Sequence, residues 1–405
     1  MDSLTQITLG AAVGEAVLGR RVGNRAMVWG AVGGTLPDLD TVANLFTDPI
    51  SALAYHRAIS HSFLFAVVAP PLLAMLIHRM YDPERKKPWL LPFLGTSVVV
   101  IALLTLGGLA LPMSFPTALA AGGSVGIAMM LFPLGVGLRQ RFRKRPSKNP
   151  NASWQGWALL LFAAIATHPL LDSCTTFGTQ LFQPFSDYRV AWNNVSVVDP
   201  LYTVPFIVCV LLTLRLTRGS VRRRWINILG LTLSTGYLGL TVINKMHVNR
   251  VFEQTLAERG IAYQRYMTAP TLLNNILWQA TAEGDSSFYF GYYSLFDRKS
   301  RFADLKEVPK RHDLLAPYEG DREVEVLQWF ANGYYAVEPD PAGGLFFNDL
   351  RFGRIQTSAE DPGHYVFQFQ LKPRAPNDVD AVQEEASRRN LDGAFEFLWR
   401  RMLGR

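Results

Sequence analysis

The stretch "YHRAISHSFLFAVVAPPLLAMLIHRM" (residues 55–80) combines two features that decide the class of fold. From Ile59 onward it is apolar for about 20 residues, which is the length that a helix needs to cross the hydrocarbon core of a bilayer. His56, Arg57 and His61 stand where the bilayer would begin. Ionisable groups in a membrane domain are costly and usually functional. The stretch therefore predicts a transmembrane helix with a polar site at its first residues.

Further apolar stretches long enough to span a membrane follow the first one. Two shorter segments at the N-terminus, 3–18 and 26–36, are rich in Gly and Ala, which lets helices pack closely. We expect a mainly α fold, in which a polytopic bundle of about six spans is preceded by a short helical hairpin. The expected spans are 59–80, 90–111, 116–138, 154–172, 200–217 and 225–244.

The charge of the chain divides unevenly. Its net charge is +7. Residues 1–245 carry 21 Lys or Arg against 10 Asp or Glu, a net +11, so residues 246–405 carry a net −4. Within 1–245 the cations gather in alternate connections, which the positive-inside rule places in the cytoplasm. This excess indicates membrane topology, and we expect no nucleic-acid partner. The basic connections are 20–25, 79–87, 139–148 and 215–224, whereas 112–115 has no Lys or Arg and 173–199 has only Arg189.

The last 160 residues differ in character. Short, aromatic-rich, partly alternating stretches at 288–297, 323–339, 343–353 and 364–373 are separated by Gly, Pro and Asp, which is typical of strands in a small antiparallel sheet. We expect a helix through "NKMHVNRVFEQTLAERG" to lead into them, and a final helix over 378–402. The predicted organisation is a transmembrane domain, 1–245, that carries the site, and a soluble extracytoplasmic α+β domain, 246–405.

Several classes of protein are disfavoured. Only Cys174 and Cys209 are present, so neither a disulfide framework nor a Cys-rich zinc site is available. The N-terminus "MDSLTQ" lacks the basic region of a cleavable signal peptide. No strand–GxGxxG–helix pattern and no P-loop is found, and nothing supports a bound NAD, PLP or haem.

Three polar motifs reach one depth in this topology. "PDLD" (37–40), "YHRAISHS" (55–62) and "THPLLDS" (167–173) all fall at extracytoplasmic helix ends. Together they offer nitrogen and oxygen ligands without cysteine, which suits one or two divalent metal ions, zinc first and manganese or magnesium next. The predicted metal ligands are Asp38, Asp40, His56, His61, His168 and Asp172.

Each motif alone has an ordinary alternative. His168 and Asp172, at i and i+4, lie on one helical face, where they could bind one ion or form an ion pair that staples the helix end. Asp38 and Asp40 face the same side if their segment is extended, or they are solvated acids after a helix. Ser60 is a natural N-cap, which would put His61 in the first turn.

His56 and His61 of "YHRAISHS" could equally be interfacial groups hydrogen-bonded to the loop.

Two other residues are candidates for catalysis. Arg57 could bind a phosphate oxygen or hold a ligand carboxylate. Asp199 precedes Pro200, and could be a further ligand, a general base or only the N-cap of the next helix.

A metal held by His and Asp at a water-accessible mouth points to hydrolysis, because a bound cation activates water and polarises a carbonyl or phosphoryl oxygen. We expect the substrate to be a phosphoester or another ester near the lipid headgroups, with the bilayer itself as a partner. A lipid-linked substrate is one option within this class. Two other functions compete. One is an ion or solute transporter, and the other is a non-enzymatic envelope protein in which a metal staples the helix ends.

An ordered set of motifs also resembles a known family. "LTQITLGAAVGEAVLGRR", "NRAMVWGAVGGTLPDLD", "HRAISHS", "THPLLDSCTTFGTQLFQPFS" and "VVDPLYT" are similar to the YdjM-like family, over roughly residues 1–205. Its members are described as LexA-regulated, metal-dependent hydrolases of the bacterial inner membrane, and the resemblance implies the same six metal ligands. Family members often have Thr-His near the N-terminus, whereas this chain has Thr5 and Gln6, a poor ligand.

Overall fold

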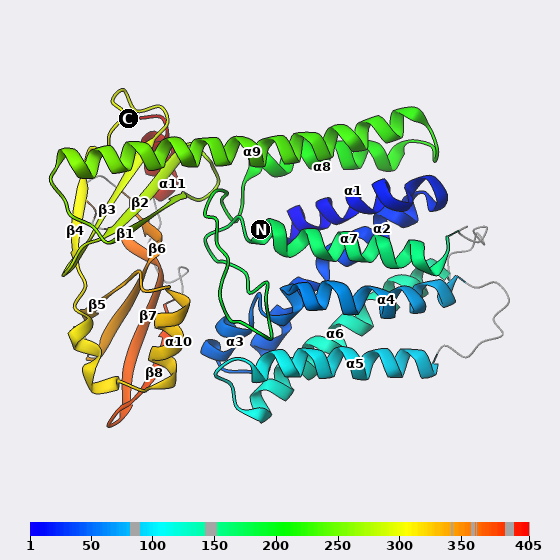
Figure 1. The fold of residues 1–405 in the computed structure, drawn as a ribbon, viewed down its shortest axis with the longest axis horizontal. Helices are drawn as coiled ribbons and strands as arrows, with labels where there is room; N and C mark the ends of the chain where they lie inside the picture. Colours follow the sequence, from blue (N-terminus) through cyan, green and yellow to red (C-terminus); the bar gives the residue numbers. More distant parts are fainter. Residues whose placement is uncertain are drawn as a thin grey trace. The chain divides into compact units, whose positions relative to one another are not determined.

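The computed structural model of the chain describes residues 1–81, 90–141, 152–341, 343–357, 361, 363–384 and 393–404. It divides into two compact units (Figure 1). Unit 1 comprises Met1–Trp192 and Pro200–Tyr237, and unit 2 comprises Asn193–Asp199 and Leu238–Arg405. Each unit is described by itself below.

The elements of unit 1 are helices, and the segment after α7 adds an isolated antiparallel bridge between Thr179 and Val190. Its helices pack side by side, with α7 against α1, α2 and α4, and α5 against α6 (Figure 1). The elements are α1 (Ser3–Val22), α2 (Asn24–Thr35), η1 (Pro37–Leu45), α3 (Pro49–Tyr55), η2 (Ile59–His61), α4 (Phe63–Met80), α5 (Leu90–Leu109), α6 (Phe115–Arg141), α7 (Trp154–Asp172), α8 (Pro200–Arg215) and the first part of α9 (Val221–Glu258).

The helices have the length and surface of membrane spans. Five of the described helices, α4, α5, α6, α7 and α9, are long and apolar enough to cross a membrane, whereas α8 has only 16 residues. Outward-facing apolar side chains such as Val67, Val98 and Ile127 are more than half exposed, as lipid contact requires. The predicted helical hairpin and apolar helices are therefore present, and the number of spans stays a prediction.

Glycines set the close contact between α1 and α2. A Cβ on Gly30 would lie 2.1 Å from the carbonyl oxygen of Gly10, and one on Gly14 would lie 2.2 Å from that of Ala26. The two backbones therefore touch, which only residues without a side chain permit. Because α2 leads directly into Pro37, this packing fixes the segment that carries Asp38 relative to α1.

The connections α1–α2 and α8–α9 lie at the same end of unit 1. Arg218 Nε donates to the carbonyl of Arg20 at 3.0 Å, and Asn24 Nδ2 donates to that of Leu214 at 3.0 Å. Both connections are rich in arginine. Most of the other two predicted basic connections, 79–87 and 139–148, lie outside the described residues.

Arg223 of α9 and Glu15 of α1 form a buried ion pair. Arg223 donates to both carboxylate oxygens of Glu15 at 2.6 Å, and further to Asn24 and to the carbonyl of Leu216. Gly19 makes room for the Glu15 carboxylate, since a Cβ there would lie 2.2 Å from it. The Glu15 carboxylate of α1 is thus neutralised by the Arg223 guanidinium of α9, because a charge among apolar helices needs a partner.

Unit 2 contains two antiparallel four-stranded sheets. The strands of each sheet are in sequence order, β1-β2-β3-β4 and β5-β6-β7-β8. The last turns of α9 pack on the first sheet, where Phe252 belongs to one buried core with Trp278, Tyr293 and Phe302. The strands are β1 (Arg265–Pro270), β2 (Leu277–Glu283), β3 (Ser287–Ser294), β4 (Leu305–Pro309), β5 (Tyr335–Pro339), β6 (Leu345–Ile355), β7 (His364–Ala375) and β8 (Asp378–Gln383), with η3 (His312–Tyr318), α10 (Arg322–Phe330) and α11 (Ala394–Met402).

Two predictions for this part of the chain were wrong in detail. The stretch 323–339 was expected to be extended, but its first half is α10, because Asp321 caps Glu323 and Val324 and the helix buries Leu327 and Phe330. The predicted helix over 378–402 begins instead as strand β8. Just before β8, Asn377 adopts φ +62° and reverses the chain, so that β8 pairs antiparallel with β7.

Candidate metal centre

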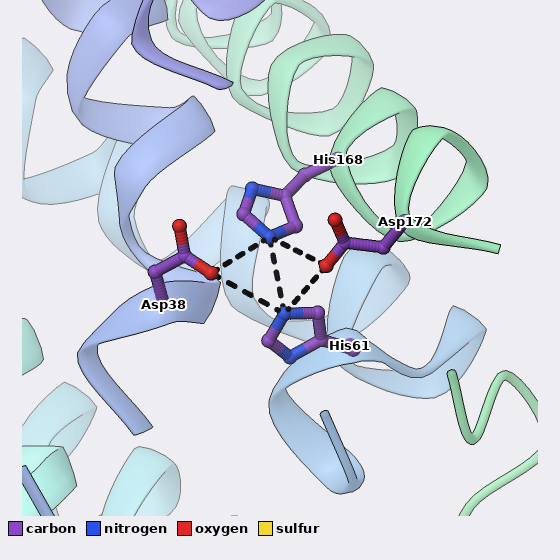
Figure 2. A group of neighbouring side chains, drawn as sticks. All are labelled: Asp38, His61, His168 and Asp172. Atoms are coloured by element: carbon purple, nitrogen blue, oxygen red, sulfur yellow. Dashed lines mark hydrogen bonds and ion pairs between the residues drawn. The ribbon is translucent and has the colours of Figure 1, made fainter. Parts of the chain in front are cut away.

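Four of the predicted ligands meet in one buried cluster in unit 1. Asp38 comes from η1, His61 from η2, and His168 and Asp172 from the last turn of α7 (Figure 2). One ligand atom from each lies within 4.8 Å of the others. His61, His168 and Asp172 are fully buried, whereas the Asp38 side chain is 14% exposed. Three segments distant in sequence thus converge at the end of α7, and the cluster can hold one metal ion.

The separations are those of ligands around a single ion. His61 Nε2 and His168 Nε2 are 3.0 Å apart, and Asp172 Oδ2 lies 3.3 and 3.4 Å from these two atoms. Asp38 Oδ1 lies 3.3 Å from His168 Nε2 and 3.7 Å from His61 Nε2. Bonds of 2.0–2.2 Å to a tetrahedral zinc ion place neighbouring ligand atoms about 3.3 Å apart. The donor set fits a small divalent cation.

The other ring nitrogen of each histidine is held by the protein. His168 Nδ1 lies 2.7 Å from the carbonyl oxygen of Gly34, and His61 Nδ1 lies 3.3 Å from Asp40 Oδ2. These acceptors place a proton on Nδ1, which leaves the Nε2 atoms as the ligands. Metal-binding histidines are commonly oriented in this way by a carboxylate or a carbonyl.

Asp40 and His56 lie behind His61. Asp40 Oδ1 is 2.9 Å from His56 Nδ1, and Asp40 Oδ2 accepts from the backbone N–H of Arg57 at 2.8 Å. The rings of His56 and His61 are 6.2 Å apart, and the His56 side chain is 24% exposed. These two predicted ligands therefore pair with each other beside the four-residue cluster.

Two local predictions were wrong. Asp38 and Asp40 were expected on one side of an extended segment, but η1 is a 3₁₀ helix, whose three residues per turn direct them to different nitrogens of His61. Ser62, and not Ser60, caps α4 by accepting from Phe65. Ser60 instead lies 3.2 Å from Asp40 Oδ2 and 3.0 Å from His61 Nδ1.

Arg57 is buried beside Asp172. Its Nε lies 3.2 Å from Asp172 Oδ2, its Nη1 donates to Thr175 Oγ1 at 2.9 Å, and its guanidinium lies over Phe177. The residue adopts a left-handed conformation, with φ +60°. Arg57 thus holds a carboxylate of the cluster, which is one of the two roles predicted for it. The "SCTTF" segment after Asp172 supplies its partners, which the sequence reasoning missed.

Position 6 also reaches the cluster. Gln6 Nε2 donates to Asp172 Oδ1 at 2.9 Å and to the carbonyl of His168 at 3.2 Å, and the amino group of Met1 contacts the same Oδ1. Neither Gln6 Oε1 nor Asp172 Oδ2 accepts a hydrogen bond among the described residues, although Arg57 Nε lies 3.2 Å from Asp172 Oδ2 as an ion pair. A buried anionic oxygen that faces two imidazole nitrogens without a hydrogen bond is suited to a cation.

The charges of the cluster favour a positive ion at its centre. Burial opposes ionisation of Asp38, but His168 and His61 outweigh it and hold the pKa of this carboxyl well below its usual range. Carboxylate oxygens of Asp38, Asp40 and Asp172 also lie within 3.7 Å of the ring nitrogens of His61. The surrounding carboxylates therefore stabilise positive charge between them.

The predicted catalytic residue Asp199 belongs to unit 2. It is buried and directly precedes Pro200, the first residue of α8. The four-residue cluster does not include it.

The helical bundle with its buried His–Asp cluster defines a membrane protein with a candidate metal centre. The YdjM inner membrane protein family matches residues 1–248, more than half of the chain, so the chain belongs to this family. The predicted resemblance and the membrane location are confirmed. No protein of curated function and no solved structure matches the chain.

Proposed function

We propose that this protein is a metal-dependent hydrolase of the inner membrane. The observation that carries the proposal is the cluster of Asp38, His61, His168 and Asp172, whose two Nε2 atoms are aimed at one point by Gly34 and Asp40. A divalent cation at that point supplies polarisation of a phosphoryl or carbonyl oxygen and lowers the pKa of a water molecule.

The number of protein ligands bears on which ion supports catalysis. Four ligands close a tetrahedral zinc site, and closed sites are structural. An octahedral ion such as manganese or magnesium keeps open positions with the same four ligands. A catalytic zinc ion would need an open position, and Asp38, the most exposed member of the cluster, would be the ligand that leaves one. Substrate therefore approaches from the side of Asp38.

His56, behind His61, is the partly exposed histidine beside the cluster and is suited to move a proton there. Its Nδ1 faces Asp40 Oδ1 at 2.9 Å, so the proton on Nδ1 is donated to the carboxylate and Nε2 is the basic atom. His56 is partly exposed, whereas the imidazoles of the cluster are buried. We assign it as the general acid–base, in place of the Asp199 that the sequence suggested.

The location of the cluster suggests the side of the membrane and the kind of substrate. Gln6 of α1 contacts the cluster, whereas Arg20 lies 14 residues further along the same helix, roughly 21 Å away. If the arginine-rich connections face the cytoplasm, the cluster faces the extracytoplasmic surface. A phosphoester or other ester near the lipid headgroups is the substrate class we propose.

Metal analysis of purified full-length protein tests the site. We expect wild type to hold about one equivalent of a divalent metal, and His168→Ala and Asp172→Asn to lose it. His78→Ala is the matched control, because His78 stands near the opposite end of α4 and should leave metal content unchanged. Full metal content in His168→Ala would contradict the ligand assignment.

Hydrolysis assays then test the activity. Wild type supplied with each candidate metal is assayed on chromogenic phosphoesters and carboxylic esters and on phospholipids. We expect His56→Ala to retain the metal but to lose about 10²–10⁴-fold in rate, the usual contribution of a general acid–base. A protein that binds metal but hydrolyses none of these esters with any metal would show that the ion only staples the helix ends.

A further inference from the structure

Unit 2 contains a second candidate site, in the part of the chain beyond the family match. A cavity of about 420 Å³ opens between β3, the loop from 295 to 304, the start of β4, the end of β6 and helix α11. This volume lies within the range of pockets that bind small organic molecules.

The cavity is strongly basic. Six cationic side chains and two carboxylates line it, a net charge of +4, although residues 246–405 as a whole carry net negative charge. One carboxylate is already neutralised, because Arg401 donates to both oxygens of Asp297 at 2.8 Å. Asp304 is the other carboxylate among the lining residues. The cationic lining residues are Arg298, Lys299, Arg301, Lys306, Arg354 and Arg401.

The loop that carries three of these cations is held in place. Phe302 is fully buried against Phe252 and Tyr293, and its backbone N–H donates to Thr255 Oγ1 at 3.1 Å. At the other end, Asp297 accepts from the backbone N–H of Ser294 at 2.9 Å. The backbone between these anchors carries Arg298, Lys299 and Arg301 at the surface. Such preorganisation lowers the entropy cost of gathering several cations around one anion.

Aromatic side chains supply the other part of the lining. Phe290, Tyr292 and Phe397 border the cavity, and the Tyr292 hydroxyl donates to the carbonyl of Arg354 at 2.9 Å. Arginine and lysine beside aromatic surface suit a ligand with an anionic group and an organic part. A single small anion would leave much of the 420 Å³ unfilled.

We propose that this cavity binds a phosphate group carried by an organic molecule, either a phospholipid headgroup or a soluble phosphoester. The phosphate contacts the cations of the loop, and the organic part lies against the aromatic side chains. Two cations of the loop, Lys299 and Arg301, are exposed and can be replaced without disturbing the core. The proposal does not depend on the metal centre of unit 1.

Binding to the full-length protein in uncharged detergent tests the proposal. The probes are glycerol 3-phosphate and dihexanoylphosphatidylglycerol below its micellar concentration, titrated calorimetrically at constant ionic strength. We expect saturable binding that the double variant Lys299→Gln/Arg301→Gln weakens at least about tenfold, since hydrogen bonds to charged groups contribute strongly. The charge-matched control is Lys372→Gln/Arg374→Gln, on β7, outside the cavity, which should change affinity by less than about twofold.

The two probes separate the sources of the phosphate. Lipid binding that is at least about tenfold tighter than glycerol 3-phosphate binding identifies a headgroup site, and similar affinities identify a site for soluble phosphoesters. The proposal is overturned if neither probe binds, or if both double variants weaken binding equally, which would reveal a general charge effect. It is also overturned if binding survives Lys299→Gln/Arg301→Gln, because the phosphate then binds elsewhere.

Discussion

His61 and His168 face each other through their Nε2 atoms at 3.0 Å, although they are 107 residues apart in the chain. Their Nδ1 atoms are turned outward, to Asp40 and to the carbonyl of Gly34. Two imidazole lone pairs at this distance repel unless a proton or a cation lies between them. The orientation of this pair is therefore the strongest structural argument for a metal ion, and it depends on residues that would not themselves touch the ion.

Asp40→Asn tests that dependence. We expect metal affinity to fall about 10–100-fold without complete loss, because the amide orients His61 less well and no longer raises its basicity. Competition with a metal-binding dye measures this. Asp187→Asn, at an exposed position of the segment after α7, is the control and should keep the wild-type affinity. Unchanged affinity in Asp40→Asn would show that Asp40 does not position His61.

Gly30→Ala tests the contact between α1 and α2. The added Cβ would lie 2.1 Å from a backbone oxygen, so the helices must separate, and we expect a loss of at least about 1–3 kcal/mol, as for overpacked cores. Gly123→Ala in α6, where nothing lies within 4 Å of the new Cβ, should be neutral or slightly stabilising. Thermal unfolding in detergent compares the two. Equal melting temperatures would contradict the backbone contact.

Glu15→Gln tests the buried ion pair. The substitution leaves the Arg223 guanidinium buried without its carboxylate, which typically costs about 3–5 kcal/mol. We expect the paired variant Glu15→Gln/Arg223→Met to recover much of that loss, since no uncompensated charge remains. Unfolding of the single and double variants forms a double-mutant cycle. Additive losses would show that the two groups do not interact as their 2.6 Å contacts indicate.

We expect the stability of unit 2 to depend on pH through His312. Burial lowers its pKa, and Lys310 lowers it further, against a hydrogen bond to the carbonyl of Tyr335 that raises it. The folded state therefore binds the proton less tightly than the unfolded state. The contribution of His312 to the free energy of unfolding is fully present above its ordinary pKa of about 6.5. This contribution is lost as the pH falls from there toward the folded-state pKa.

Hydrogen exchange in β5, compared between wild type and His312→Asn at each pH, measures this effect. We expect protection of β5 to fall between pH 7.5 and 5 in wild type and to vary less in the variant. His364→Asn, at an exposed position, should behave as wild type. A wild-type profile in His312→Asn would assign the pH dependence to other groups.

The sequence predicted the helices of unit 1 well because each is a long apolar segment with a clear beginning and end. The stretches 90–111 and 154–172 correspond to α5 and α7 within two residues. Residues 323–339 and 378–402 were harder, because short alternating segments suit either a strand or a helix. There a cap such as Asp321, or a turn such as that at Asn377, decides whether the segment forms a helix or a strand.

By itself the sequence determined which side chains stand at the ends of the apolar helices, because hydropathy and charge act along the chain. It could not divide those side chains between metal ligands and their supports. Asp38 and Asp40 are two residues apart, yet one faces the Nε2 atoms and the other holds Nδ1 of His61. That division rests on the turn of η1 and on the contact of the α1 and α2 backbones, which are tertiary geometry and leave no periodic signal in the sequence.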